Sequence, residues 1–152
     1  MTPLEKIKAL GLELPPAAAP LGAYVPSVRT GNLVFTSGQL PIKGGTLIAT
    51  GKVPENVPLE TAQECARQAA LNALAAAAAA AGSLDKIVRI VRLNVFVNSS
   101  PHFCDQAKVA NGASELLVQV FGDAGRHTRC AIGAAELPLN APVELDLVVE
   151  VQ

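Results

Sequence analysis

Two charged residues toward the C-terminus have the types and spacing that chemistry on a small acid requires. Arg129 lies in the segment from Arg126 to Gly133, and Glu144 lies in the mainly apolar segment from Val143 to Leu147. Arg is the preferred bidentate partner of a carboxylate, because its guanidinium presents several N–H donors in a planar fork. If the two segments are paired strands, Glu144 is a proton acceptor close to this cation. The two residues therefore predict a site that binds a small carboxylate through Arg129.

Each of these residues also has a simpler interpretation. Arg129 could form a surface salt bridge, and a Glu on a strand is more often solvated than functional. Tyr24, the only Tyr of the chain, could cap an edge of the core. The residues by themselves leave these alternatives open.

Sequence motifs exclude several other kinds of chemistry. The chain has neither of the glycine-rich nucleotide-binding motifs, no zinc-protease His-Glu motif and no serine-hydrolase nucleophile motif. His102 with Cys104, and His127 with Cys130, are spaced like metal-ligand pairs, but neither has a second pair at a suitable distance. We therefore predict that the chain has no metal site.

Composition limits the class of protein. A chain of 152 residues is long enough for one domain, and this one has 50% hydrophobic residues but only 3% aromatic residues and no Trp. Its core must consist of Ala, Val, Leu and Ile, and surface shared between subunits would supplement the area that such a core buries. With 12 basic and 13 acidic residues and no long run of either sign, the chain lacks the electrostatic signature of a nucleic-acid partner.

Neither a targeting segment nor a membrane span is indicated. Residues 1–20 lack a basic region followed by an apolar run, and the alanine-rich tract before Gly82 is too weakly hydrophobic to cross a bilayer. Cys65, Cys104 and Cys130 form neither an even set nor a C-x-x-C pair, which favours free thiols in a reducing compartment. We expect a cytoplasmic protein without disulfides and without a membrane partner.

The N-terminal segment is predicted to be an appended arm. Apolar residues between Thr2 and Leu12 have the spacing of a short amphipathic helix, and Gly11 would end it. Pro15 and Pro16, with the Ala/Pro stretch that follows, favour an extended connector. We divide the chain into this helical arm and connector, residues 1–20, and a main domain, residues 21–152.

The main domain is predicted to begin with a hairpin and a helix. Residues 33–37 have the composition of a strand, and glycines at residues 43–46 indicate a turn, so two or three antiparallel strands should precede residue 52. The pattern Thr61-x-x-Glu64 is typical of a capping box, and the helix that it opens should run to Gly82.

The remaining segments are predicted to complete one sheet. Residues 87–97 form the longest strand signal, residues 101–120 a less regular helix, and residues 122–125 a loop into the strand of Arg129. The closing strand alternates apolar and polar residues, which buries one of its faces. This order predicts an α+β fold, a mixed sheet with both helices packed on one face. The other face then needs cover, which an oligomer would supply.

In these segments the chain resembles the Rid family, also called the YjgF-type proteins, which are trimeric 2-iminobutanoate/2-iminopropanoate deaminases. The resemblance covers the chain from about Gly22 to the C-terminus and indicates a longer subfamily with an N-terminal extension. The segments that carry it are Gly22-Ala23-Tyr24, Asn32 to Pro41, the helix through Asn72 into Gly82, Asn94 to Val97, Arg129-Cys130 with Leu137-Pro138, and Val143-Glu144-Leu145.

The resemblance implies a role for each site residue. The family's Arg binds the substrate carboxylate, which assigns that role to Arg129, and Glu144 would position or activate the attacking water. Tyr24 would line the pocket across a subunit boundary, and Gly38 would offer backbone at the pocket floor. The other implied substrate-binding residues are Ala131 and Asn111.

The resemblance also implies a reaction and an assembly. An enamine such as 2-aminoacrylate tautomerises to the imine, water adds to the imine carbon, and ammonia leaves a 2-oxo acid, without any cofactor. The implied protein is a cytoplasmic hydrolase with a chorismate-mutase-like fold, a homotrimer with sites between subunits. Its expected partner is a small-molecule carboxylate rather than a nucleic acid.

The chain departs from the family pattern around Arg129, and two alternative functions follow. The familiar Pro-Ala-Arg-Ser run is here His127-Thr128-Arg129-Cys130, and Gly133 stands where many deaminases have Glu. One alternative is a non-catalytic trimer that binds small carboxylates such as 2-oxo acids as a sensor. Some relatives carry an L-PSP-type endoribonuclease label, but balanced charge, scarce aromatic residues and the lack of a His pair argue against RNA cleavage.

Overall fold

The structure, a computed structural model, describes residues 1–20 and 22–152 and confirms the α+β class. Residue 21, the first residue of the predicted main domain, lies outside the described residues. Short 3-10 turns lie at η1 (Leu84–Lys86), η2 (Gly122–Gly125) and η3 (Pro138–Asn140). The helices and strands are α1 (Pro3–Ala9), β1 (Ser27–Thr30), β2 (Leu33–Thr36), β3 (Ile42–Lys43), β4 (Thr46–Leu47), α2 (Leu59–Ala81), β5 (Ile87–Asn98), α3 (Gln106–Phe121), β6 (Thr128–Ala134) and β7 (Val143–Val151).

The main sheet is mixed, as predicted. Its strand order is β1-β2-β7-β5-β6, and all neighbours are antiparallel except β5 and β6, which are parallel. Strand β5 therefore separates β6, which carries Arg129, from β7, which carries Glu144. These two strands do not pair, so the condition under which we expected Glu144 to lie close to Arg129 is not met. Strands β3 and β4 form a separate two-stranded sheet.

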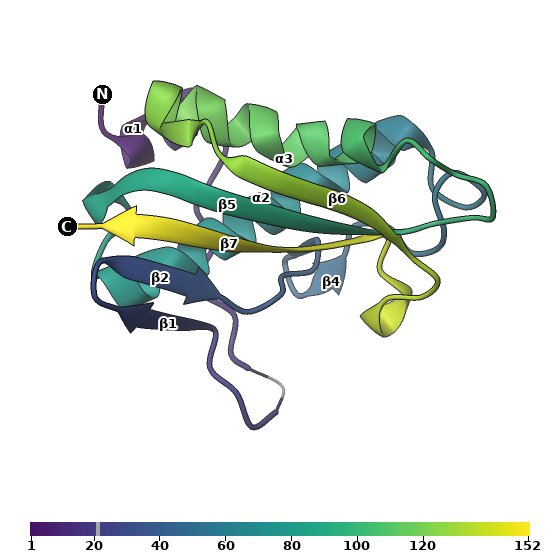
Figure 1. The fold of residues 1–152 in the computed structure, drawn as a ribbon, viewed down its shortest axis with the longest axis horizontal. Coiled ribbons are helices and arrows are strands. Elements are labelled where there is room, and N and C mark those ends of the chain that lie inside the picture. The colour runs from purple at the N-terminus through teal and green to yellow at the C-terminus, as the bar shows by residue number, and fades with distance from the viewer. Residues whose placement is uncertain (21) are drawn as a thin grey trace.

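Helices α2 and α3 lie against one face of the main sheet, with the strands in front of them in Figure 1. From Val143 to Val151 strand β7 alternates between buried and half-buried residues, so the predicted alternation is confirmed. No helix among the described residues covers the opposite face. There Val28, Phe35 and Ile132 are each at least 43% exposed.

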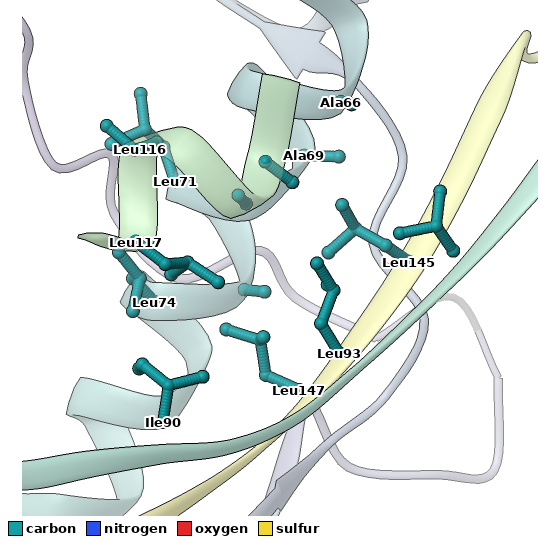
Figure 2. Packing of buried hydrophobic residues seen from close by; sticks show 14 of the residues in the cluster. Ala66, Ala69, Leu71, Leu74, Ile90, Leu93, Leu116, Leu117, Leu145 and Leu147 are labelled. Carbon is teal, nitrogen blue, oxygen red and sulfur yellow. The ribbon is translucent and has the colours of Figure 1, made fainter. Parts of the chain in front are cut away.

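The core between helices and sheet is aliphatic, as the composition predicted. Leu and Ile side chains from α2, α3, β5 and β7 meet in this layer (Figure 2). The alanines of α2 allow its backbone to lie close to the neighbouring elements, because a methyl side chain takes up little space between them. Gly112 serves the same purpose on α3, since a Cβ there would collide with the backbone of Gln63 on α2. The two helices thus cross at a distance that only small residues allow.

The N-terminal arm packs on the main body. Helix α1 is shorter than predicted, and Thr2 caps it in a reciprocal capping box with Glu5. Ile7 is fully buried in the core cluster, and the Leu4 backbone N–H donates to Asp85 Oδ1 at 3.3 Å. The arm is therefore part of the packed structure.

Two predicted helix starts are wrong. Helix α2 begins at Leu59 after an extended Pro58, so Thr61 already lies inside the first turn and forms no capping box. Helix α3 begins at Gln106 instead of residue 101, because His102 has a φ of 69°, a left-handed conformation that a right-handed helix excludes. The predicted end of α2 is confirmed, since Gly82 has a φ of 97°. Strand β1 was not predicted, because three of its four residues are exposed and it lacks a buried face.

Candidate functional site

Arg129 lies on β6, the edge strand beside β5. Its partner in the parallel register is Leu93, a fully buried residue of the helix-facing side, so the Arg129 side chain points to that side too. There its Nη1 donates to Asn111 Oδ1 at 2.8 Å and to Ser114 Oγ at 3.1 Å. Both acceptors lie on α3, so this helix fixes one corner of the guanidinium.

The other edge of the Arg129 guanidinium has no acceptor among the described residues. Nη1 uses its two hydrogens on α3, whereas Nε and Nη2 make no hydrogen bond or ion pair within residues 1–20 and 22–152. In this part of the chain the ion pairs join Lys108 to Asp105 and Arg126 to Asp123, so the salt-bridge interpretation of Arg129 finds no support. Nε and Nη2 form one side of the planar fork, the geometry that binds a carboxylate through two parallel hydrogen bonds.

His127 continues the network behind Arg129. Its Nε2 lies 2.9 Å from Ser114 Oγ, and its Nδ1 lies 2.6 Å from the carbonyl oxygen of Gly125. A carbonyl oxygen only accepts, so Nδ1 carries the proton and Nε2 of the neutral ring accepts from the Ser114 hydroxyl. Burial lowers the pKa of His127, the positive charge of Arg129 lowers it further, and the Gly125 bond opposes both effects. The neutral form is thus favoured.

Glu144 lies on the opposite face of the sheet. It pairs with Phe96, which is three residues from Leu93 along β5, and an odd separation on a strand reverses the face. The side chain is half-buried, and its carboxylate makes no hydrogen bond among the described residues. Burial raises its pKa first, and the nearby negative charge of Asp146 raises it further. A carboxylate in this state is a better proton acceptor than a solvated one.

Gly38 lies against Glu144, and Tyr24 shares a cavity with Gly38. A Cβ at Gly38 would collide with the Glu144 carboxylate, so only glycine leaves this carboxylate in place. Gly38 and Tyr24 also line a cavity of about 470 Å³ between the connector at residues 15–20 and the segment that carries β3. The Asn72 side chain braces this segment by donating to the carbonyl oxygens of Leu40 and Ile42, at 2.9 and 3.0 Å.

The predicted site residues therefore fall into two groups within one subunit. Ala131 pairs with the buried Val95, so it shares the face of Arg129, and it packs against the core cluster. Asn111 contacts the Arg129 guanidinium directly. The second group consists of Tyr24, Gly38 and Glu144. In the second group Gly38 lies against Glu144, and Tyr24 lines a cavity with Gly38. The structure does not bring Arg129 and Glu144 together within one subunit.

Sequence reasoning missed Ser114 and the role of His127. Asn111 and Ser114 are polar residues three positions apart on a helix whose buried residues are all apolar, and that spacing places both on one face. The spacing was the available signal. His127 had been weighed as a metal-ligand candidate with Cys130, yet its ring nitrogens face Ser114 and Gly125.

Neither a metal-binding cluster nor a membrane-spanning helix occurs in the part of the chain that the structure describes. No cluster of three or more His, Cys, Asp or Glu side chains that could hold a metal ion occurs there. No described helix has the length and apolar character needed to cross a membrane. Cys104 and Cys130 are exposed free thiols, and burial raises the pKa of the Cys65 thiol to about 11.

Comparison with known proteins assigns the family. The family model of the YjgF/chorismate mutase-like proteins, whose description adds an endoribonuclease label, matches residues 5–151. The chain belongs to the YjgF/Rid family. The fold of this family is consistent with the mixed sheet and three helices observed.

Relatives and solved structures agree with this membership. Protein TCP17 of Trypanosoma cruzi is 47% identical over 95% of this chain and 91% of its own length. A 2-iminobutanoate/2-iminopropanoate deaminase of Dermatophagoides farinae is 28% identical over 93% of this chain and 95% of its own. The crystal structure of Atu1372 from Agrobacterium tumefaciens, a protein described as having unknown function, is 46% identical, with a TM-score of 0.92 over 99% of this chain and 92% of that one. Deaminase names thus occur among the more distant relatives of the chain.

Proposed function

We propose that this chain is a deaminase that hydrolyses reactive enamine and imine intermediates of the 2-aminoacrylate type to 2-oxo acids and ammonia. The observation that carries the proposal is the Nε–Nη2 edge of Arg129, which has no acceptor among the described residues while α3 holds Nη1 in place. A planar cation in this state suits the carboxylate that 2-aminoacrylate, its imine and the 2-oxo acid product all share. The deaminase name of the Dermatophagoides farinae relative supports the same reaction class.

The reaction needs a carboxylate anchor, a water molecule and a group that moves protons. The enamine carbon gains a proton and the nitrogen loses one, which gives the imine, and water then adds to the imine carbon. Glu144 takes a proton from this water and passes it to the nitrogen, which gives a carbinolamine. Transfer of the remaining hydroxyl proton to the nitrogen, again through Glu144, lets the carbon–oxygen double bond form as the carbon–nitrogen bond breaks, and ammonia and the 2-oxo acid result. Its raised pKa favours both steps, because an acceptor works best when its pKa approaches the working pH.

We propose that the active unit is a homotrimer with sites between subunits. Arg129 and Glu144 lie on opposite faces of one sheet, so one subunit is poorly placed to present both to one small molecule. Arg129 lies on the edge strand β6, so a neighbouring subunit that packs along this edge as well as over the open face would bring its own Glu144, Gly38 and Tyr24 toward Arg129. The exposed apolar residues of this face would be buried by the same contact, which gives the assembly a hydrophobic driving force.

A coupled assay tests the proposal. A serine dehydratase supplies 2-aminoacrylate, and the appearance of pyruvate is followed with and without the purified protein. We expect the wild type to accelerate pyruvate formation above the spontaneous rate, and Arg129→Ala to lose most of this acceleration. Arg126→Ala is the matched control, because Arg126 is an exposed Arg three residues away whose side chain, among the described residues, pairs only with Asp123.

Two results would contradict the proposal. One is a wild type that leaves the rate unchanged, and the other is an Arg129→Ala variant as active as the wild type. If the wild type is inactive but pyruvate raises its melting temperature, and Arg129→Ala abolishes this shift, the chain is a carboxylate sensor instead. A ligand that binds only the folded state stabilises it by mass action, with or without turnover.

A further inference from the structure

We infer that His127 and Ser114 are positioning residues, which orient Arg129 so that its Nε–Nη2 edge faces the substrate carboxylate. The inference rests on the proposed role of Arg129 as the carboxylate anchor. Ser114 contacts the guanidinium directly, and His127 contacts Ser114, so both would act on the substrate only through Arg129. The inference also gives a structural role to His127, which occupies the position of the Pro in the Pro-Ala-Arg-Ser run of the Rid family.

The hydrogen bonds run in one direction along the chain of residues. Arg129 Nη1 can only donate, so the Ser114 hydroxyl oxygen accepts from it at 3.1 Å. The Ser114 hydroxyl hydrogen is then available to His127 Nε2 at 2.9 Å. The ring in turn donates from Nδ1 to the Gly125 carbonyl oxygen at 2.6 Å. Each hydrogen bond of the series thus has a fixed direction, and Gly125, a buried residue of η2, is its last acceptor.

The direction of the series requires a neutral His127. A protonated ring would donate from both nitrogens, and the Ser114 oxygen would then face two cationic donors at once. The charge of Arg129 and the half-buried position both lower the pKa of His127, which agrees with this requirement. Nε2 of the neutral His127 ring therefore accepts the hydrogen bond from the Ser114 hydroxyl.

The anchoring of Nη1 determines which edge of Arg129 remains available. A guanidinium is planar, so two fixed hydrogen bonds on Nη1, one to Asn111 and one to Ser114, fix the plane and the direction of the other nitrogens. Without Ser114 or its partner His127, the group can rotate about its last side-chain bonds. A guanidinium that rotates freely is no longer held in the orientation that binds the carboxylate, so binding becomes weaker.

Variants at the two positions test the inference. Ser114→Ala removes the acceptor, His127→Leu removes the ring nitrogens, and His127→Gln keeps an acceptor oxygen near the position of Nε2. We expect the Kd for pyruvate, and the KM in the coupled assay, to rise about tenfold for Ser114→Ala, as for the loss of one hydrogen bond to a charged group. His127→Leu should raise both constants by a similar factor, whereas kcat should change less and His127→Gln should restore most of the affinity.

A double-mutant cycle separates positioning from general damage to the fold. If His127 acts on Arg129 through Ser114, the double variant Ser114→Ala/His127→Leu should have the same Kd for pyruvate as Ser114→Ala alone. Purely structural effects would instead add. Arg126→Ala serves again as the neighbouring control, because its side chain is exposed and lies outside the series.

The His127 ring also gives a readout in the wild-type protein itself, without substitution of Ser114 or His127. The chain has only two His residues, so ¹⁵N spectra of the wild type and of His102→Asn assign the His127 signals. We expect the neutral tautomer with hydrogen on Nδ1, and a shift of the Nε2 signal on pyruvate binding that is absent in Arg129→Ala.

The outcomes distinguish this inference from the proposed function. A wild type that binds pyruvate without turnover counts against the deaminase alone, and the Kd values still decide the role of His127 and Ser114. The inference is overturned if His127 carries its hydrogen on Nε2, if the two substitutions act additively, if His127→Leu binds pyruvate as tightly as the wild type, or if the wild type binds no 2-oxo acid.

Discussion

Arg129 and Glu144 project from opposite faces of one sheet, with strand β5 between their strands. Leu93 and Phe96, three residues apart on β5, pair with positions on the two faces and establish this relationship. A small substrate cannot pass through a sheet to reach both side chains. Each functional site must therefore combine residues of different subunits if both side chains act on the same molecule.

Co-expression of two inactive variants tests this geometry. Subunits with Arg129→Ala keep Glu144, and subunits with Glu144→Gln keep Arg129. If the proposed trimer forms, mixed trimers should contain some interfaces with both native residues. Random mixing of equal amounts should restore about one quarter of the wild-type sites, measured as pyruvate formation per subunit. Preparations expressed separately are the control, and no recovery in the mixed trimers would place both residues of each site in one subunit.

Gly38→Ala should impair catalysis without loss of carboxylate binding. The added Cβ would collide with the Glu144 carboxylate and displace it from its position on the open face. Loss of a positioned proton acceptor typically costs roughly 10²-fold or more in rate, so kcat should fall by this order. The Kd for pyruvate should change little, because the carboxylate anchor Arg129 is unaltered. The melting temperature should also change little, because the added Cβ meets only the end of the half-buried Glu144 side chain, which can move aside. An unchanged kcat would show that Glu144 is not needed at this position.

The pH dependence of kcat/KM should reveal the environment of Glu144. Only its ionised form can take a proton from water, and burial together with Asp146 raises its pKa, so activity should fall with decreasing pH above the usual range of a Glu. Asp146→Asn removes a negative charge while keeping an acceptor for Asn94 Nδ2, which now donates to Asp146 Oδ1 at 2.9 Å. The acidic limb should then move to lower pH. If the acidic limb does not move, Glu144 is not the group whose titration causes it.

Glu144 should also contribute to the pH dependence of stability. A carboxyl group whose pKa is raised in the folded state binds its proton more tightly there, so its contribution is fully present below the unfolded pKa. This contribution is lost as the pH rises through the folded pKa. Glu144→Gln should therefore raise the melting temperature at neutral pH and have little effect in acid. A melting temperature that falls at neutral pH would contradict this expectation.

Gly112→Ala should destabilise the fold, which is the reverse of the usual effect. Replacing glycine by alanine inside a helix normally favours the helix, but here the Cβ would collide with the backbone of Gln63 on α2. Forcing the helices apart should lower the free energy of unfolding by about 1–3 kcal/mol, measured by urea denaturation. The Kd for pyruvate should rise too, since α3 carries Asn111 and Ser114. A stabilised variant would mean that the helices separate easily.

Local pattern was sufficient for most of the elements. Period-two alternation set the buried face of β7, and the apolar run of β5 set the longest strand, because a side chain on a strand can face only two ways. Gly82 ended α2 because a left-handed residue stops a helix. The predicted starts of α2 and α3 were wrong because each start depends on the backbone conformation just before the helix, at Pro58 and at His102. The spacing of side chains does not reveal that conformation.

The residue types alone determined the chemistry that the site can offer, and the tertiary structure decided how that chemistry is arranged. Arg129 and Glu144 were recognisable because a guanidinium and a strand carboxylate have few substitutes as carboxylate anchor and proton acceptor. Their separation on two faces, the support of Arg129 by Ser114 and His127, and the contact of Gly38 with Glu144 depend on strand order and helix packing. Each of these relationships joins residues that are distant in the chain. They come together only when the whole aliphatic core is buried, and no local segment of the sequence encodes that burial.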